Sequence, residues 1–285
     1  MTGQPSLPPT HGPLADVTAL HLDKDREKSQ QEYEIIRDAF MRLLEHWDNS
    51  AESLEILTDI ITRRCASLIE RMLDGLSLDF DRALVLLRNH NDFTTHTERE
   101  QRDILVAAIG NLVDFAASGQ YTLLRELPEQ PDGNRYDEYE DICRRYNLTW
   151  AMQENEDVHY AAVMAAWWTT VSSDTMLTFM TQGDERVRPW HEALEGVSYP
   201  KREFPSELIP PIEYACRCYL VAEGFGSVVG ALPEGKPSFA VHPVFRESLC
   251  TGGRIFSGEH PYFRHPLPLP IQKIVRNIKQ KFYLL

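Results

Sequence analysis

Residues 181–218 read TQGDERVRPWHEALEGVSYPKREFPSELIPPIEYACRC, and here the chain changes character. Five prolines fall within this stretch. Because proline interrupts both helix interiors and central strands, the stretch predicts loops and short strands. The sequence before it is rich in helical signals. The predicted fold class is therefore α+β, a mainly helical N-terminal part followed by a small loop-rich α+β C-terminal domain.

The sequence before residue 128 predicts a helical bundle that follows a proline-rich leader at residues 1–28. Ser29 with Glu32 matches a capping box, and apolar side chains then recur at spacings of three and four. Thr97 with Glu100 matches a second capping box before another apolar series. We therefore expect the bundle to occupy residues 29–127.

Residues 128–135 hold two prolines, an Asp and a Gly, and they predict a linker. Beyond it, helices are predicted at 136–146, 150–171 and 271–282, and strands at 175–181, 219–222 and 238–241. The domain after the linker is assigned to residues 136–268. Residues 269–285 form a predicted basic helix that contains no acid and carries Lys273, Arg276, Lys279 and Lys281.

The composition is that of a soluble globular protein of 285 residues with a net charge of −14. The acidic excess lies in the first part, which disfavours a DNA-coating role because such binding depends on Lys and Arg. In the middle of the chain the longest stretch without a charged side chain is 16 residues, too short to cross a bilayer comfortably. We therefore expect no membrane contact. Five thinly spread cysteines indicate thiols or ligands rather than a disulfide framework.

The block at 181–218 resembles the phage head morphogenesis proteins, the Mu F-like minor head (minor capsid) protein family. The family pattern is T-x-x-D-x-R-V-R-P-x-H-x-x-L-x-G followed by P-P-x-x-x-x-C-R-C. The matching residues are Thr181, Asp184, Arg186, Val187, Arg188, Pro189, His191, Leu194, Gly196, Pro210, Pro211, Cys216, Arg217 and Cys218. Residues 245–263 are also similar to a tail found in some members.

This resemblance implies a structural protein of a tailed phage or prophage that takes part in capsid assembly at or near the portal. The implied partners are the portal protein, the major capsid protein, or both. The implied location is the virion, after synthesis in the bacterial host cytoplasm. Two alternatives remain open: a toxin-like nuclease or transferase that carries a phage-type docking domain, and an assembly factor absent from the mature virion.

Three side chains of the block suit zinc. His191, Cys216 and Cys218 offer imidazole and thiolate, the donors that Zn²⁺ prefers. The alternative is that all three are small buried core residues. No other cofactor is expected.

Charged residues of the block have predicted structural roles. Asp184 can accept backbone N–H groups and shape a turn. Arg186, Arg188 and Arg217 either brace the loops through hydrogen bonds or face a partner. The basic C-terminal helix can contact packaged DNA or an acidic protein surface.

The sequence contains no convincing catalytic constellation, so we expect no enzyme activity. The segment HEALE departs from the metalloprotease pattern H-E-x-x-H because Glu195 stands at the second histidine position. Glu154 and Glu156 mimic the paired glutamates of ADP-ribosyltransferases, but they lie in a predicted helix. We interpret both glutamates as part of a solvated helix face.

Overall fold

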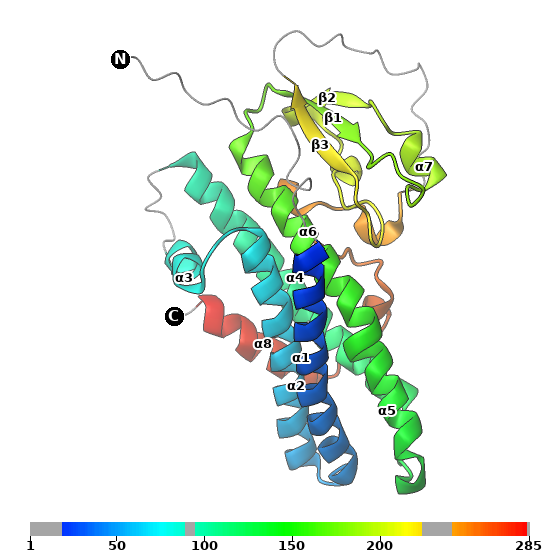
Figure 1. The fold of residues 1–285 in the computed structure, drawn as a ribbon. Helices are drawn as coiled ribbons and strands as arrows, with labels where there is room; N and C mark the ends of the chain where they lie inside the picture. The colour runs from blue at the N-terminus through cyan, green and yellow to red at the C-terminus, as the bar shows by residue number, and fades with distance from the viewer. Residues whose placement is uncertain (1–18, 89–94, 224–240, 284–285) are drawn as a thin grey trace.

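The structure, a computed structural model, describes residues 19–88, 95–223 and 241–283. The fold is α+β and mainly helical, as predicted, with a small antiparallel sheet in the C-terminal part. Figure 1 shows the sheet and α7 at one end of the helical bundle. The helices are α1 (Ala19–Glu45), α2 (Ser50–Gly75), α3 (Phe80–Arg88), α4 (His96–Glu126), α5 (Tyr136–Arg144), α6 (Trp150–Thr170), α7 (Pro189–Glu192) and α8 (Leu269–Tyr283).

Helix α2 forms the centre of the bundle and packs against α1, α4 and α6. Its contact with α6 is close because Gly75 has no side chain. A Cβ at this position would lie 2.5 Å from the carbonyl oxygen of His159. Gly75 is thus required by the approach of two backbones rather than by an unusual φ angle.

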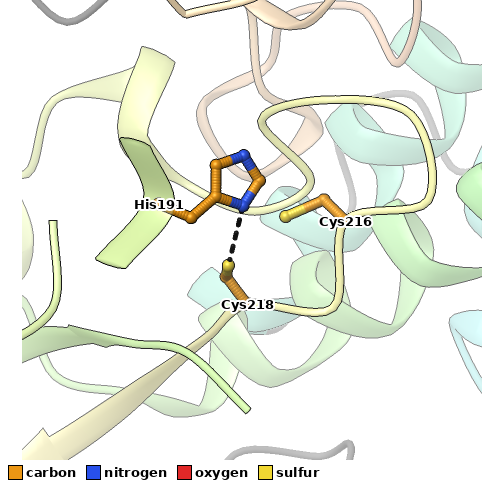
Figure 2. Close-up of side chains that lie close together, drawn as sticks. All are labelled: His191, Cys216 and Cys218. Carbon is orange, nitrogen blue, oxygen red and sulfur yellow. Dashed lines mark hydrogen bonds between the residues drawn. The ribbon is translucent and has the colours of Figure 1, made fainter. Parts of the chain in front are cut away.

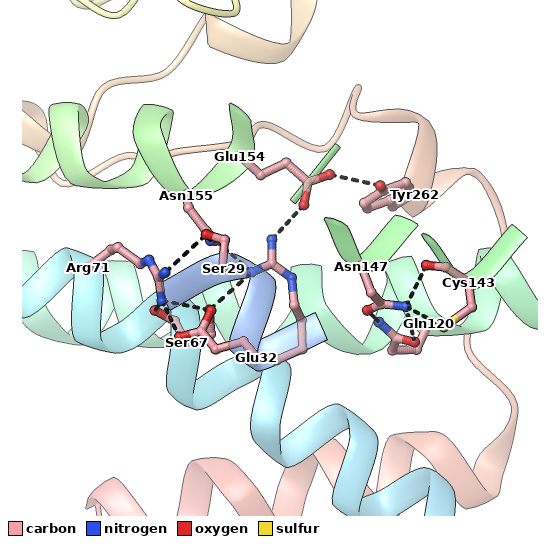
Figure 3. Close-up of polar contacts among 11 residues, drawn as sticks. Ser29, Glu32, Ser67, Arg71, Gln120, Cys143, Asn147, Glu154, Asn155 and Tyr262 are labelled. Atoms are coloured by element: carbon pink, nitrogen blue, oxygen red, sulfur yellow. Dashed lines mark hydrogen bonds and ion pairs between the residues drawn. The ribbon is translucent and has the colours of Figure 1, made fainter. Parts of the chain in front are cut away.

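A buried polar network joins α1, α2 and α6 (Figure 3). Arg64 on α2 forms an ion pair of 2.7 Å with Glu154 and donates a 2.6 Å hydrogen bond to Asn155. Arg71 pairs with Glu32 on α1 at 2.5 Å. Arg64 and Arg71 are each only 4 % exposed, so these partners offset the cost of burying their charges.

The predicted helix start at Ser29 is wrong, because α1 already begins at Ala19. Ser29 is buried inside the helix, where its hydroxyl accepts hydrogen bonds from Arg71 and Asn155. Its contacts are therefore tertiary rather than those of a helix cap. Residues 1–18 of the predicted leader lie outside the described residues.

Helix α4 is a core helix. It is long and apolar enough by composition to cross a membrane, but 72 % of its apolar window is buried inside the protein. The predicted capping box at Thr97 is wrong, since Thr95 caps the helix by accepting a 3.2 Å hydrogen bond from the Glu98 amide. The apolar series that follows Thr97 does form a helix, as predicted.

Residues 136–170 are helical almost as predicted. Helix α5 and helix α6 are joined by a π-helical turn over Arg145–Thr149, so the chain bends without leaving helical geometry. Asn147 in this turn is buried and accepts a 2.6 Å hydrogen bond from Gln120 on α4. The two predicted helices are therefore two α-helices, and the residues between them are also helical.

The sheet has the order β2-β1-β3, with both pairings antiparallel. Strands β1 (Met176–Met180) and β3 (Tyr219–Glu223) confirm two predicted strands, while β2 (Ser198–Pro200) was not predicted. Nearly all of the third predicted strand, 238–241, lies outside the described residues, as does the glycine-rich segment 224–230.

Residues 243–264, which we call the strap, return from the sheet region to the helices. Asn111 on α4 anchors the strap by accepting 3.0 Å hydrogen bonds from the amides of Ile255 and Phe256. It also donates a 2.9 Å hydrogen bond to the Phe256 carbonyl. Phe115 stacks on Phe256 with ring centroids 4.2 Å apart. The tail that resembles phage proteins is thus bound to the bundle.

Helix α8 confirms the predicted C-terminal helix and packs against α4, α2 and α3. Its apolar face is buried through Ile271, Ile274, Val275 and Ile278. One hydrophobic cluster extends from Tyr33 on α1 to these residues and includes the sheet. The boundary at residues 128–135 therefore stays a prediction, and the hydrophobic packing continues across it.

Candidate functional site

The block at 181–218 connects the end of β1 to the start of β3 along the chain. Its first turn is shaped by Asp184, which accepts a 3.1 Å hydrogen bond from the Arg186 amide, as expected. Asp184 also forms a two-point contact with Arg217, at 2.6 and 2.8 Å. These hydrogen bonds from Arg217 hold the pKa of Asp184 below its usual value. The two ends of the block are therefore joined at the surface.

The block contains four arginines, and the three that belong to the family pattern differ in role. Arg217 braces the turn at Asp184, and Arg188 donates a 2.8 Å hydrogen bond to the Tyr214 carbonyl. Arg188 also lies 3.2 Å from the carboxylate of Glu213. Arg186 is exposed. The structure thus supports a bracing role for two of them and leaves Arg186 at the surface.

The remaining motif residues shape the backbone. Pro189 occupies the first turn of α7, and Leu194 is fully buried behind that helix. Gly196 has a φ of +83°, a left-handed conformation that favours glycine. The buried residues Pro210 and Pro211 are joined by a cis peptide bond. These residues are structural parts of the block.

His191, Cys216 and Cys218 lie together, as the zinc hypothesis requires (Figure 2). His191 is on α7, while the cysteines come from the loop before β3. The Nδ1 atom of His191 is 3.2 Å from the Sγ atom of Cys218. One donor atom from each residue lies within 4.8 Å of the others, and all three side chains are buried. This is the only such group among the described residues.

Glu213 lies behind the imidazole and was not identified from the sequence. Its Oε2 atom is 3.3 Å from Nε2 of His191, although the angle does not make a hydrogen bond. The Trp190 indole donates a 3.1 Å hydrogen bond to the same oxygen. A carboxylate behind a histidine is the usual partner that orients a metal ligand. Here it would leave Nδ1 directed at the two sulfurs.

The two thiols influence each other's ionisation. Burial raises the pKa of Cys216, but hydrogen bonds with Cys218 and His191 outweigh it and lower this pKa well below its usual value. The hydrogen bond to Cys216, together with burial, raises the pKa of Cys218. The two pKa values move in opposite directions because two adjacent buried thiolates would repel each other.

Helix α6 fixes the cysteine loop from its inner side. The Tyr160 hydroxyl donates a short hydrogen bond to the Cys218 carbonyl. Asp157 accepts a 2.9 Å hydrogen bond from the amide of Ala215, whose φ is +55°. Burial raises the pKa of Asp157 well above its usual value. These contacts were not identified from the sequence, since the residues are 58 positions apart.

The glutamates that suggested enzymes do not gather at His191. Glu192 and Glu195 are exposed, and Glu195 accepts a short hydrogen bond from Thr181. The solvated face expected for Glu154 is wrong, because this residue is buried against Arg64 and accepts a 2.7 Å hydrogen bond from Tyr262. Glu154 is therefore a structural partner within the core.

The fold and the site define a mainly helical α+β protein with a buried His-Cys-Cys cluster beside a small sheet. No family model matches the chain, and no solved structure matches it. A segment of 40 residues is 50 % identical to an uncharacterized protein of Methanocaldococcus jannaschii. The segment makes up 14 % of this chain and 6 % of that protein. No family or structural neighbour indicates catalysis.

Proposed function

We propose that this chain is a structural minor head protein of a tailed phage or prophage, which joins the assembling capsid at or near the portal. The carrying observation is that the residues of the phage-like block form one braced unit. Asp184 contacts Arg217, Arg188 contacts the Tyr214 carbonyl, and His191 contacts Cys218. Such cross-links suit a binding platform, because a preorganised surface loses little conformational freedom on binding.

The proposed partners are the portal protein, the major capsid protein, or both. Synthesis takes place in the bacterial cytoplasm, and the mature location is the capsid near the portal. Arg186 is the exposed one of the three arginines of the family pattern and is proposed to face the partner. Helix α8 supplies a second contact to packaged DNA through the exposed Lys273, Arg276 and Lys281, since Lys279 is paired with Asp114 at 2.7 Å.

Purified particles test this proposal. Mass spectrometry should find the chain at a low, reproducible ratio to the portal protein. The Arg186→Ala variant should be incorporated less, whereas Arg125→Ala, an exposed site on α4, should be incorporated normally. Absence of the chain from particles would contradict the minor head proposal and favour the assembly factor.

The proposal includes a zinc ion held by His191, Cys216 and Cys218. The residues fit this ion because they supply one imidazole and two sulfurs from a buried, closely spaced set. When bound, zinc would keep both sulfurs as thiolates and cross-link α7 to the chain entering β3. The role is structural, and the carboxylate of Glu213 lies 3.3 Å from Nε2 on the other side of the imidazole.

Metal analysis tests the zinc site. Chain purified without chelators should contain about one zinc per molecule, and Cys216→Ser should lose most of it. Cys250→Ser changes another buried cysteine, outside the cluster, and should keep the metal. Replacement by Co²⁺ should give the visible absorption of thiolate-bound cobalt in the unaltered chain and in Cys250→Ser, and this absorption should be largely lost in Cys216→Ser. Equal zinc contents in both variants would contradict the assignment.

A further inference from the structure

A cleft of about 1510 Å³ runs beside α6 and reaches the loop that carries the cysteines. Gln153, Glu156 and Asp157 line its α6 wall, and Arg186 and Arg217 lie on the side of the phage-like block. Of the three candidate zinc ligands, Cys216 lines the cleft, whereas His191 and Cys218 do not. The cleft is therefore separate from the imidazole side of the candidate metal centre.

Asp157 places an unpaired acceptor in this cleft. The residue is 2 % exposed, and its Oδ1 atom accepts hydrogen bonds from the Ala215 amide at 2.9 Å and from Gln153 at 3.1 Å. Its other oxygen, Oδ2, has no hydrogen-bond partner among the described residues. Leaving a buried carboxylate oxygen without a donor is costly. The site therefore lacks a donor group, preferably a cationic one.

Glu156 adds a second carboxylate to the same wall. It is partly buried, and burial raises its pKa, while Arg26 and Arg186 oppose this shift. Both arginines are exposed side chains at the cleft. They leave the deeper oxygen of Asp157 without a hydrogen bond. The α6 wall thus carries two carboxyl groups, and one oxygen of Asp157 lacks a donor.

We propose that this cleft binds an alkylammonium or guanidinium group, which donates to Oδ2 of Asp157 while Glu156 adds a second negative charge. A cation of this kind supplies the missing donor and favours the ionised form of Asp157 over the neutral form that burial favours. It can come from a Lys or Arg side chain of a partner protein or from a free amine. The inference goes beyond the proposed head function, because it rests on the cleft alone.

Titration calorimetry on the full chain tests the site with two probes. Agmatine represents the free amines, and the blocked peptide acetyl-Gly-Arg-Gly-amide represents a partner's side chain. We expect saturable binding of at least one probe. Tighter binding of the peptide indicates a protein partner, and tighter binding of agmatine indicates a small amine.

Asp157→Asn is the decisive variant. The amide oxygen can still accept from Ala215, so the loop should keep its conformation, but an NH₂ group replaces Oδ2 and opposes a cationic donor. Binding should weaken by about tenfold or more. Asp141→Asn, an exposed change on α5, should bind as the unaltered chain does.

A third variant addresses competition within the chain. Arg186→Ala removes a guanidinium that interacts with Glu156, so it should bind the probe at least as tightly. Three results would overturn the proposal: no saturable binding of either probe, equal affinity in Asp157→Asn, or loss of binding in Arg186→Ala. None of them depends on whether the chain is found in phage particles.

Discussion

His260 shows how one buried side chain makes the strap sensitive to pH. Its imidazole packs against Phe115 and Phe256, and its Nδ1 accepts a 3.2 Å hydrogen bond from the Tyr262 amide. Burial, with a smaller contribution from His242, lowers the pKa of His260 to about 3. The folded state therefore keeps this ring neutral under conditions in which the unfolded chain protonates it.

We predict that His260 makes the protein less stable in mild acid. The unfolded ring binds a proton near pH 6.5, so its contribution to stability is full above that pH and declines as the pH falls toward 3. Between pH 7 and pH 5 the loss should be about 2 kcal/mol. His260→Asn keeps a side-chain acceptor that does not titrate. Urea unfolding of both proteins at the two pH values gives the difference, and equal pH dependence would contradict the prediction.

At the level of elements, the attachment of the strap to α4 depends strongly on Asn111. This side chain serves two amides and one carbonyl of the strap, and it is 6 % exposed. No other described residue contacts these groups through an equivalent set of side-chain hydrogen bonds. Asn111 is therefore the main polar anchor of this part of the strap, while Tyr262 adds a hydrogen bond to Glu154 on α6.

We predict that Asn111→Ala destabilises the fold by about 3 kcal/mol, because it leaves three buried backbone groups without a partner. Ser118→Ala is a suitable comparison, since it changes another buried polar residue of α4 and should cost less. Chemical denaturation measures the free energy of unfolding. Hydrogen exchange at Ile255 and Phe256 should accelerate in Asn111→Ala, and an unchanged exchange rate would contradict the anchoring role.

Much of this element pattern is local and could be predicted from the sequence. Apolar spacing located α6, and the segments 175–181 and 219–222 were recognised as the strands that match β1 and β3. Ser29 misled the prediction because a residue suited to a cap instead bonds across three helices. The hydrogen bond between Asn111 and Phe256 joins residues 145 positions apart, so no local sequence pattern predicts it.

The candidate site was predictable to the same extent. The donor chemistry of His191, Cys216 and Cys218 and the turn at Asp184 could be recognised from residue types and spacing. Glu213 and Asp157 could not, because a carboxylate acquires its role here from where it packs. The residues next to Glu213 and Asp157 in the sequence form no motif that indicates these roles.

At the level of the whole molecule, the helical part and the sheet part share a hydrophobic core. Helix α6 lies beyond the predicted linker but packs against α2, and the strap covers α4. The buried ion pair between Arg64 and Glu154 also links the two sides of residues 128–135. Neither part has a complete covering of its apolar surface without the other.

We predict that a fragment of residues 19–127 does not fold cooperatively, because the faces of α2 and α4 covered by α6 and the strap become exposed. The full chain should unfold in one transition, with the same midpoint by circular dichroism and by tryptophan fluorescence. A stable, monomeric fragment with a sharp urea transition would instead confirm the boundary predicted at 128–135.

The distance along the chain between Asn111 and Ile255 also affects biosynthesis. These residues are 144 positions apart. Ribosomes add about 5–20 residues per second, so roughly 7–30 s pass between the synthesis of the anchor and that of its partner. During this time Phe115 and its neighbours on α4 lack their cover. Nascent chains therefore expose a hydrophobic surface that is prone to aggregation. Chaperone supply and growth temperature should strongly influence how much soluble protein a cell accumulates.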